Sequence, residues 1–391
     1  MLPAQTIEII QSTVPLLEEH GRTITDVFYQ NLFEDHPFLK NIFNMANQGK
    51  GEQSRALSDA VLAYAKNIEN VELLIPTVQR IANKHASLGI QQKHYDVVGE
   101  KLLGAIQSVL DVSSDHPAVK AWAEAYNVLA DVFIDAEKKI YQDNNEREGG
   151  WEGFRDFYID CIVEETPEVK SISFKPVDME LTPNFKGGQY IGVRVRPQGS
   201  EYYQIRQYSL SQFGQMRISV KAEQNGLVSN YLHNCKVGDV LQLQAPTGVF
   251  TLADKAKKHI FIAGGVGVTP LMSMLEESLA QGVKGESVLF IQCSKNEDNQ
   301  IYGSYLPELA GEQRFVYKNC YENSQQGDHQ GYLNIDILRT WLAENNFDTE
   351  NSQVYFCGPK SFMAVLNQFF LRIGFDQSDI HYEVFGPTTE L

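Results

Sequence analysis

The sequence has few cysteines, no cluster of basic residues and no long apolar run, and each absence excludes a class of protein. The cysteines are odd in number and never show Cys-x-x-Cys spacing, which argues against a disulfide framework and a zinc site; they are Cys161, Cys235, Cys293, Cys320 and Cys357. A formal net charge of −17 without a Lys/Arg stripe would repel nucleic acid and anionic lipid. No segment offers the ~18 uninterrupted apolar residues of a membrane span, and residues 1–10 lack the basic start of a secretion signal. We therefore expect a cytoplasmic protein with neither a membrane span nor a nucleic-acid partner.

Glycine is also scarce at the start of the chain, where only six of the 29 glycines precede Asn144. In this segment apolar residues recur at helical spacing, as in Leu57, Val61 and Tyr64, which predicts an all-α domain over 1–143. The polar run 142–148 and the following Gly149-Gly150 end the pattern. Because 391 residues with 43% hydrophobic content are too many for one ordinary core, we expect further domains.

Two further segments follow with different patterns. Residues 189–195 and 216–220 alternate apolar with other side chains between glycine turns, which predicts an antiparallel β-barrel over 150–255. From 256 to 391, buried-looking strands at 260–263, 287–292 and 353–357 are separated by helical stretches, as a parallel α/β sheet requires. The sequence thus predicts a multidomain chain in which an all-α domain, a β-barrel and an α/β domain follow one another.

A single histidine stands out in the helical segment. His85 lies near the end of a helical pattern over 75–84, and a histidine in such a place is more often structural than a metal ligand. Its surroundings favour ligation, because one ordered series of residues resembles the bacterial globin pattern: Phe28-Tyr29, Pro37, Phe43, Gln53, Leu57 and His85.

The middle segment contains a short motif after a predicted strand, Arg206-Gln207-Tyr208-Ser209, which resembles the flavin signature of the ferredoxin–NADP reductase family. An arginine can clamp the FAD pyrophosphate, a tyrosine can stack on the isoalloxazine, and a serine can reach the flavin nitrogen that accepts hydride. Gly187-Gly188-Gln189-Tyr190 precedes it, and Gly226-Leu227-Val228-Ser229 follows. We expect the latter to begin a short helix, capped near Ser229, whose free amides bind phosphate. Each piece alone reads as a turn or a helix cap, but their order and spacing favour FAD.

A glycine-rich turn lies between an apolar strand and a helix expected from Leu271. Small residues there let the backbone approach a pyrophosphate, and the turn matches the nicotinamide turn of the same reductases; it reads Gly264, Gly265, Val266, Gly267, Val268, Thr269 and Pro270. Pro270 stands where the dinucleotide fingerprint has its third glycine.

Two later motifs match the same reductases. Cys357-Gly358-Pro359 follows a strand, and since Cys357 has no nearby histidine to activate it, we expect a positional role and not a nucleophile. Glu383-Val384-Phe385-Gly386-Pro387 resembles the terminal segment that reaches back to the flavin, with Val384 where a cysteine is usual.

Together these motifs resemble the flavohaemoglobins over essentially the whole chain. The resemblance implies a globin haem domain, then FAD- and NAD(P)-binding domains. It implies that His85 is the proximal ligand of haem b iron and that Phe43 packs on the porphyrin. It also implies that Tyr29, Gln53 and Leu57 line the distal side. Tyr29 is then the donor to a bound diatomic ligand. Without the resemblance, Tyr29 and Gln53 read as ordinary packing residues.

Glu137 lies on an apolar helical stripe, where an unpaired charge is costly, so it should have a partner. The resemblance implies that Glu137 and Tyr95 form a hydrogen-bonded pair that also contacts His85. These hydrogen bonds would make the His85 imidazole a stronger electron donor to iron. From the sequence alone, Glu137 could equally cap a helix or reach water. Lys84 matches a position that tunes the haem, and it could also be an ordinary surface lysine.

The resemblance implies an NAD(P)H-dependent nitric oxide dioxygenase, which uses O₂ to oxidise NO to nitrate at haem reduced through FAD. Two alternatives stay open: an oxygen store or sensor, and a reductase of lipid or alkyl hydroperoxides. Ser294-Lys295 after the second strand offers no carboxylate for a ribose hydroxyl, and Lys295 could accept a phosphate, whereas the resemblance favours NADH with NADPH tolerated. We expect a monomer, and the sequence leaves open whether lipid enters the haem pocket.

Overall fold

The computed structural model describes residues 2–49, 51–253 and 257–386. Contacts between Cα atoms divide the chain into two compact units, one comprising Met1–Phe154 and Gly192–Arg206, the other Arg155–Ile191 and Gln207–Leu391.

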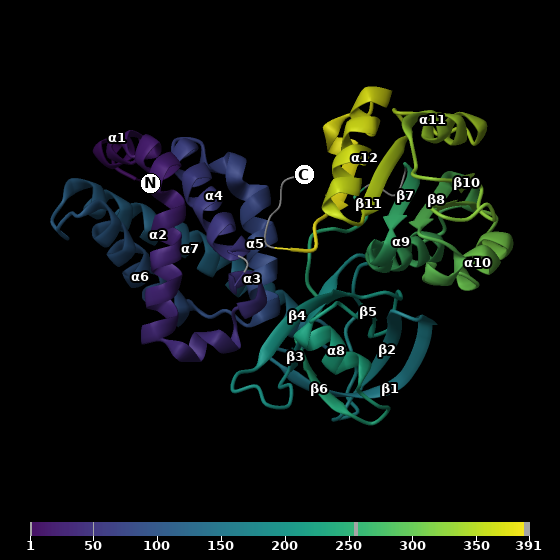
Figure 1. The fold of residues 1–391 in the computed structure, drawn as a ribbon, viewed down its shortest axis with the longest axis horizontal. Helices are drawn as coiled ribbons and strands as arrows, with labels where there is room; N and C mark the ends of the chain where they lie inside the picture. The colour runs from purple at the N-terminus through teal and green to yellow at the C-terminus, as the bar shows by residue number, and fades with distance from the viewer. Residues whose placement is uncertain (1, 50, 254–256, 387–391) are drawn as a thin grey trace. The chain divides into compact units, whose positions relative to one another are not determined.

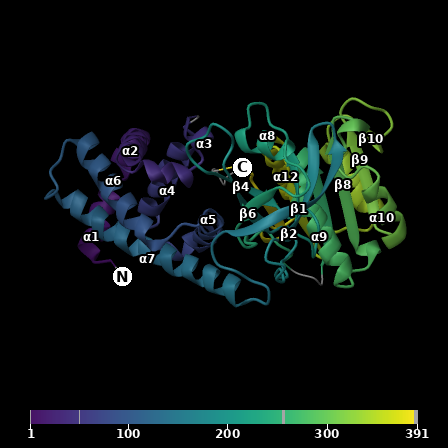
Figure 2. The same ribbon diagram turned by 90° about the horizontal axis from the view of Figure 1, so that it is seen from below.

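The first unit contains the predicted all-α domain. Its helices are α1 (Ala4–Ser12), α2 (Val14–Asp35), the 3₁₀ helix η1 (Pro37–Asn41), α3 (Met45–Gly49), α4 (Glu52–Lys66), η2 (Val71–Leu74), α5 (Ile75–Leu88), α6 (Gln92–Leu110) and α7 (Pro117–Glu146). Helix α2 packs against α4 and α6, and α7, the longest helix, runs beside α5 and α6 (Figure 2). Phe28, Leu32, Ala105 and Trp122 are among the buried residues of its core.

Two local features set the junction between α5 and α6. Gly89 ends α5 with a left-handed φ of +73°, which a residue without Cβ adopts without strain. Gln91 and His94 then form a reciprocal capping box at the start of α6. Further along, a Cβ on Gly99 would lie 2.5 Å from the Tyr126 ring, so this glycine allows the close packing of α6 on α7.

The predicted β-barrel is confirmed as an antiparallel half-barrel. Its strands are β1 (Arg155–Thr166), β2 (Val169–Pro176), β3 (Tyr190–Val195), β4 (Gln204–Ser209), β5 (Arg217–Lys221) and β6 (Val240–Leu243), in the order β4-β3-β6-β1-β2-β5. An isolated bridge between Leu210 and Ile218 links the chain beyond β4 to β5. Helix α8 (Leu227–His233) follows the Gly226 turn, as predicted.

The predicted parallel α/β sheet is also confirmed. It has the order β10-β9-β8-β7-β11-β12, with β7 (Lys258–Gly264), β8 (Val288–Ser294), β9 (Val316–Tyr321), β10 (His329–Gln330), β11 (Ser352–Cys357) and β12 (Ile380–Glu383). Four helices cover it: α9 (Val268–Ala280), α10 (Tyr305–Gln313), α11 (Ile335–Glu344) and α12 (Lys360–Ile373).

Both faces of this sheet are buried, because successive side chains of a strand point to opposite sides. Phe261 and Ala263 of β7 pack in the core that contains α9 and α10, and Ile260 and Ile262 pack in the core that contains α11 and α12. Figure 1 shows the two helix pairs on opposite faces. Among the described residues, no helix combines the length and apolar character needed to cross a bilayer.

Candidate functional site

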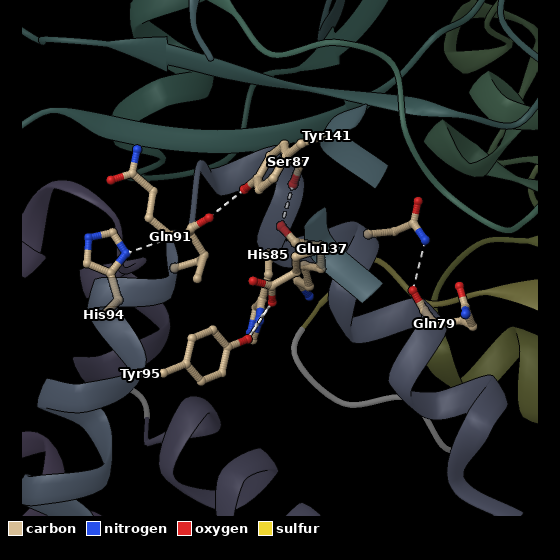
Figure 3. A network of polar contacts seen from close by, with 11 residues as sticks. Gln79, His85, Ser87, Gln91, His94, Tyr95, Glu137 and Tyr141 are labelled. Atoms are coloured by element: carbon tan, nitrogen blue, oxygen red, sulfur yellow. Dashed lines mark hydrogen bonds and ion pairs between the residues drawn. The ribbon is translucent and has the colours of Figure 1, made fainter. Parts of the chain in front are cut away.

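His85 lies at the centre of a polar cluster in the helical unit (Figure 3). Its Nδ1 is 2.7 Å from Oε1 of Glu137 on α7 and 3.1 Å from the hydroxyl of Tyr95 on α6. The Tyr95 hydroxyl donates to the same Glu137 oxygen. Glu137 is only 2% exposed, so its carboxylate has exchanged water for these two donors. The partner that the apolar stripe required is therefore present.

The geometry of this cluster suits one tautomer of His85. With hydrogen on Nδ1 the ring can donate to Oε1 of Glu137, and in that tautomer Nε2 carries the lone pair that a ligand bond needs. Burial, and then the Glu137 charge, raise the pKa of Tyr95, so its hydroxyl stays protonated and donates.

Two tyrosines that the sequence did not single out hold this cluster. The Tyr126 hydroxyl donates to the Tyr95 carbonyl at 2.6 Å, and the Tyr141 hydroxyl donates to the Ile90 carbonyl at 2.6 Å, which ties α7 to the end of α5. A signal existed, because Tyr141 follows Glu137 by four residues and therefore lies on the same helical face.

The distal candidates combine one buried hydroxyl with one unpartnered amide oxygen. Tyr29 is 6% exposed, its ring lies 5.9 Å from that of Phe43, and burial raises its pKa, so it remains a protonated donor. Among the residues that the structure describes, nothing pairs with the buried Oε1 of Gln53. Phe43 and Leu57 are only partly covered by protein atoms.

These residues fit a haem. A large apolar ring would cover the half-buried Phe43 and Leu57, and a ligand on it would meet the donor on Tyr29. In the described parts of the chain, no group of three His, Cys, Asp or Glu side chains is placed to hold a metal ion. Lys84 precedes His85 on α5 and is half-buried.

The flavin motif lies on β4. Arg206, Gln207 and Tyr208 are half-buried, Ser209 is buried, and an Arg206 Nη1 donates to the Ile205 carbonyl at 2.7 Å. A guanidinium, a phenol ring and a hydroxyl in sequence form a donor set that suits the phosphate and the ring of FAD.

Tyr190 and Ser229 are buried. The expectation that helix α8 is capped near Ser229 was wrong in one respect, the identity of the capping residue. Tyr190 is 9% exposed and pairs through its backbone with Thr247 at 2.8 Å. Gly226, not Ser229, is the N-cap of α8, without a side-chain cap. The Ser229 hydroxyl instead accepts from the Glu223 amide at 3.2 Å, because it already lies inside the first turn.

The nicotinamide turn is shaped by close backbone contacts. A Cβ on Gly267 would lie 2.2 Å from the carbonyl oxygen of Cys357, so glycine is needed where the β7 turn meets the β11 turn. Gly265 has a φ of +53°, and a Cβ there would meet nothing within 4 Å, which leaves room for a ligand. This arrangement fits a pyrophosphate, with Val266 and Gly358 beside these contacts.

Helix α9 begins at Val268, three residues before the predicted Leu271. The Thr269 hydroxyl donates to the Val266 carbonyl at 3.0 Å. Pro270 therefore lies in the first turn, where its missing N–H costs no hydrogen bond, which explains its departure from the dinucleotide fingerprint.

Cys357 is fully buried and its Sγ donates to the Glu383 carbonyl at 3.4 Å. Burial raises the pKa of its thiol well above the usual range, which agrees with a positional role. Pro359 is the N-cap of α12. Val384 packs on the core, Phe385 is 49% exposed, and Gly386 ends the described chain, so Pro387 lies outside the described residues.

Family comparisons divide the chain as the fold does. Residues 26–133 match the globin family, 160–252 the oxidoreductase FAD-binding domain, and 261–368 the oxidoreductase NAD-binding domain. The flavohemoprotein of Halalkalibacterium halodurans is 40% identical and covers 100% of this chain and 98% of its own, and that of Bacillus subtilis is 40% identical over 100% and 99%.

Solved structures agree. A flavohemoglobin from Malassezia yamatoensis with bound FAD and haem superposes with a TM-score of 0.88 at 28% identity, covering 98% of this chain and 100% of that one. The FAD/NAD-binding domain of nitric oxide dioxygenase from Vibrio cholerae gives a TM-score of 0.54 at 34% identity, covering 60% and 99%. The chain is an NAD(P)H-dependent oxidoreductase with haem, FAD and NAD(P) sites, and it belongs to the flavohaemoglobin family.

Proposed function

We propose that this protein oxidises nitric oxide with dioxygen to nitrate, using electrons from NAD(P)H that pass through FAD to haem. Bound haem, which His85 and Phe43 would hold, would supply a redox-active iron able to bind O₂. The name of the Vibrio cholerae relative, a nitric oxide dioxygenase whose FAD/NAD-binding domain resembles this one, supports the proposal. Each NO oxidised to nitrate consumes one O₂ and one electron, so one NADH, which carries two electrons, serves two NO.

The observation that carries the proposal is the buried contact between Glu137 and His85. A carboxylate that accepts Nδ1–H makes the imidazole electron-rich at Nε2, and a second donor from Tyr95 holds the carboxylate in place. An electron-rich proximal ligand favours oxygen chemistry over reversible storage. On the distal side, Tyr29 would donate to a ligand with partial negative charge, with Gln53 and Leu57 completing the pocket.

We assign the remaining cofactor contacts from the resemblance of the sequence motifs to those of the flavohaemoglobins. Phe43 and Lys84 would contact haem. The FAD contacts would be Tyr190, Arg206, Gln207, Tyr208, Ser209, Ser229 and Phe385. The nicotinamide contacts would be residues 265–270 with Cys357, Gly358 and Pro359. In each set the protein binds and orients, and the reacting groups belong to the cofactors.

The test is steady-state NADH oxidation by the full chain, loaded with haem and FAD, with separate additions of NO in air, air alone and an alkyl hydroperoxide. We expect the fastest oxidation with NO, one NADH consumed for two NO, and nitrate as product. His85→Ala should abolish the NO-dependent rate and leave NADH-driven reduction of added cytochrome by the flavin intact. Faster turnover with hydroperoxide would favour a peroxide reductase, and no stimulation by either would favour an oxygen store or sensor; both results contradict the proposal.

A further inference from the structure

Tyr302 is a bulky residue in a backbone conformation that favours glycine. It lies in the turn between β8 and α10 with a φ of +57° and is 3% exposed. Its carbonyl accepts from the Leu306 amide at 3.0 Å, at the start of α10. A left-handed tyrosine brings Cβ close to a carbonyl oxygen, so it persists only where the surrounding structure fixes it, and such residues gather at functional sites.

The Tyr302 hydroxyl begins a chain of hydrogen bonds. It lies 2.5 Å from Oγ of Ser219 in β5, which lies 2.7 Å from Oγ of Ser171 in β2. Ser171 donates to Oε1 of Glu165 in β1 at 2.6 Å. Oγ of Ser219 also lies 3.0 Å from Oγ of Ser211, so the hydroxyls of Tyr302, Ser219, Ser171 and Ser211 form one buried network that ends on the Glu165 carboxylate. Such chains strengthen each bond by polarisation.

The Tyr302 ring makes a second contact with the half-barrel. The guanidinium carbon of Arg217, at the start of β5, lies 5.3 Å from the ring centroid, a cation–π distance. Arg217 donates through Nη2 to the carbonyl of Ser211 at 2.6 Å and through Nε to its hydroxyl at 3.2 Å. Ser211 follows Ser209 of the flavin motif by two residues. Tyr302 is therefore linked, through Arg217 and through Ser219, to the segment that carries Tyr208 and Ser209.

Helix α9, which begins at the nicotinamide turn, is tied to the same half-barrel. Glu277, 7% exposed, accepts from the Gly187 amide at 2.7 Å, and Glu276 accepts from the Phe213 amide at 2.7 Å. These bonds use unstrained residues. Of the residues that connect the half-barrel to the α/β domain, Tyr302 carries backbone strain and those bonded to Glu276 and Glu277 do not. Holding Tyr302 in place therefore costs conformational energy.

We propose that Tyr302 is a positioning residue for flavin reduction, which holds the half-barrel against the parallel sheet at the separation that hydride transfer requires. In that transfer a hydride leaves the dihydronicotinamide with its electron pair and joins the flavin, and Tyr302 exchanges neither atoms nor electrons. Hydride transfer depends steeply on the distance between the reacting atoms, so a small change in this alignment slows it. The proposal rests on the FAD- and NAD-binding domains and is independent of the substrate oxidised at haem.

The test compares Tyr302→Phe, Ser219→Ala and the double variant in the full chain. Tyr302→Phe keeps the ring and removes the donor, and Ser219→Ala interrupts the chain from the other side. Stopped-flow flavin reduction gives the limiting rate and the NADH concentration at half-saturation. Hydrogen exchange of the cofactor-free chain reports β2 and β5 without any turnover. Ser278→Ala is the matched control, because it removes a fully buried hydroxyl whose partner, His259 at 2.9 Å, lies in the same α/β domain.

We expect each single variant to lower the limiting rate by about tenfold or more, with NADH half-saturation and FAD content unchanged. The double variant should be no slower than the singles, since both remove one chain. Hydrogen exchange in β2 and β5 should become faster. Ser278→Ala should change neither the limiting rate of flavin reduction nor this exchange. Rates within twofold of wild type, additive effects, or equal slowing by Ser278→Ala would overturn the proposal. If Tyr302→Phe does not fold, Ser219→Ala decides by the same criteria.

Discussion

The Glu137 carboxylate on α7 lies 2.7 Å from Nδ1 of His85 on α5, although 52 positions separate the two residues in the chain. A carboxylate that is 2% exposed needs charged or strong donors, and this one receives two on a single oxygen. His85 is therefore oriented by tertiary packing and not by its own helix.

Glu137→Gln tests this relationship because it keeps the shape and removes the charge. We expect the iron–histidine stretching frequency of the reduced protein to fall, and the haem midpoint potential to rise by about 60 mV, the equivalent of ~1.4 kcal/mol for one electron. Asp135→Asn is the matched control, since Asp135 is an exposed acid on the same helix. An unchanged frequency in Glu137→Gln would leave Glu137 a structural residue.

Tyr29→Phe should accelerate O₂ release from the ferrous protein by roughly ten- to a hundredfold. A hydrogen bond to a partly charged ligand contributes ~1.5–3 kcal/mol, and ~1.4 kcal/mol is a factor of ten. Tyr64→Phe is the control, because it also removes a buried tyrosine hydroxyl, one that donates to the Ala125 carbonyl at 3.1 Å. Stopped-flow O₂ dissociation measures both. A Tyr29→Phe rate within about twofold of wild type would make Gln53 the better candidate donor.

Gly267→Ala should weaken nicotinamide binding, because the new methyl would overlap the Cys357 carbonyl at 2.2 Å. We expect the NADH concentration at half-saturation to rise about tenfold or more and the unfolding free energy to fall by about 1–3 kcal/mol. Gly311→Ala is the control: it lies in α10 with nothing within 4 Å of its Cβ position, and should be stabilising by about 0.5–1 kcal/mol. Titration with NADH and urea unfolding of both variants check the pair.

The stability of the helical unit should fall as the pH falls below about 6.5, in part through His94. Burial lowers the pKa of His94, whose Nδ1 accepts from the Gln91 amide at 3.0 Å in the capping box of α6. The folded state therefore binds a proton at His94 less readily than the unfolded chain does. The stability that is present above the unfolded pKa is lost as the pH drops from that value to the lower pKa of the folded state.

Urea unfolding across this pH range should show a shallower acid loss for His94→Gln, which cannot titrate. His116→Gln is the matched control, because His116 also accepts an amide at a helix start, from Ala118 at 3.2 Å, but is exposed. Equal pH slopes for wild type and His94→Gln would contradict the assignment.

Sequence reasoning succeeded where one local pattern decides the outcome. Hydrophobic periodicity predicted the three fold classes, and the carboxylate of Glu137 on an apolar stripe predicted a partner. Helix α9 begins three residues before the expected Leu271, because the first turn of a helix tolerates Pro270. The ties made by Tyr126 and Tyr302 were not foreseen, since both depend on segments far away in the chain that only the fold brings together.

The contact between Gly267 and Cys357 also bears on how the chain can change in length. A Cβ on Gly267 would lie 2.2 Å from the Cys357 carbonyl oxygen, so the turn after β7 and the turn after β11 are in close backbone contact. Neither turn can be lengthened alone, because an inserted residue in one would displace the other. Insertions and deletions among relatives should therefore avoid 264–270 and 357–360 and collect in surface connections such as 322–328, where the backbone turns in solvent.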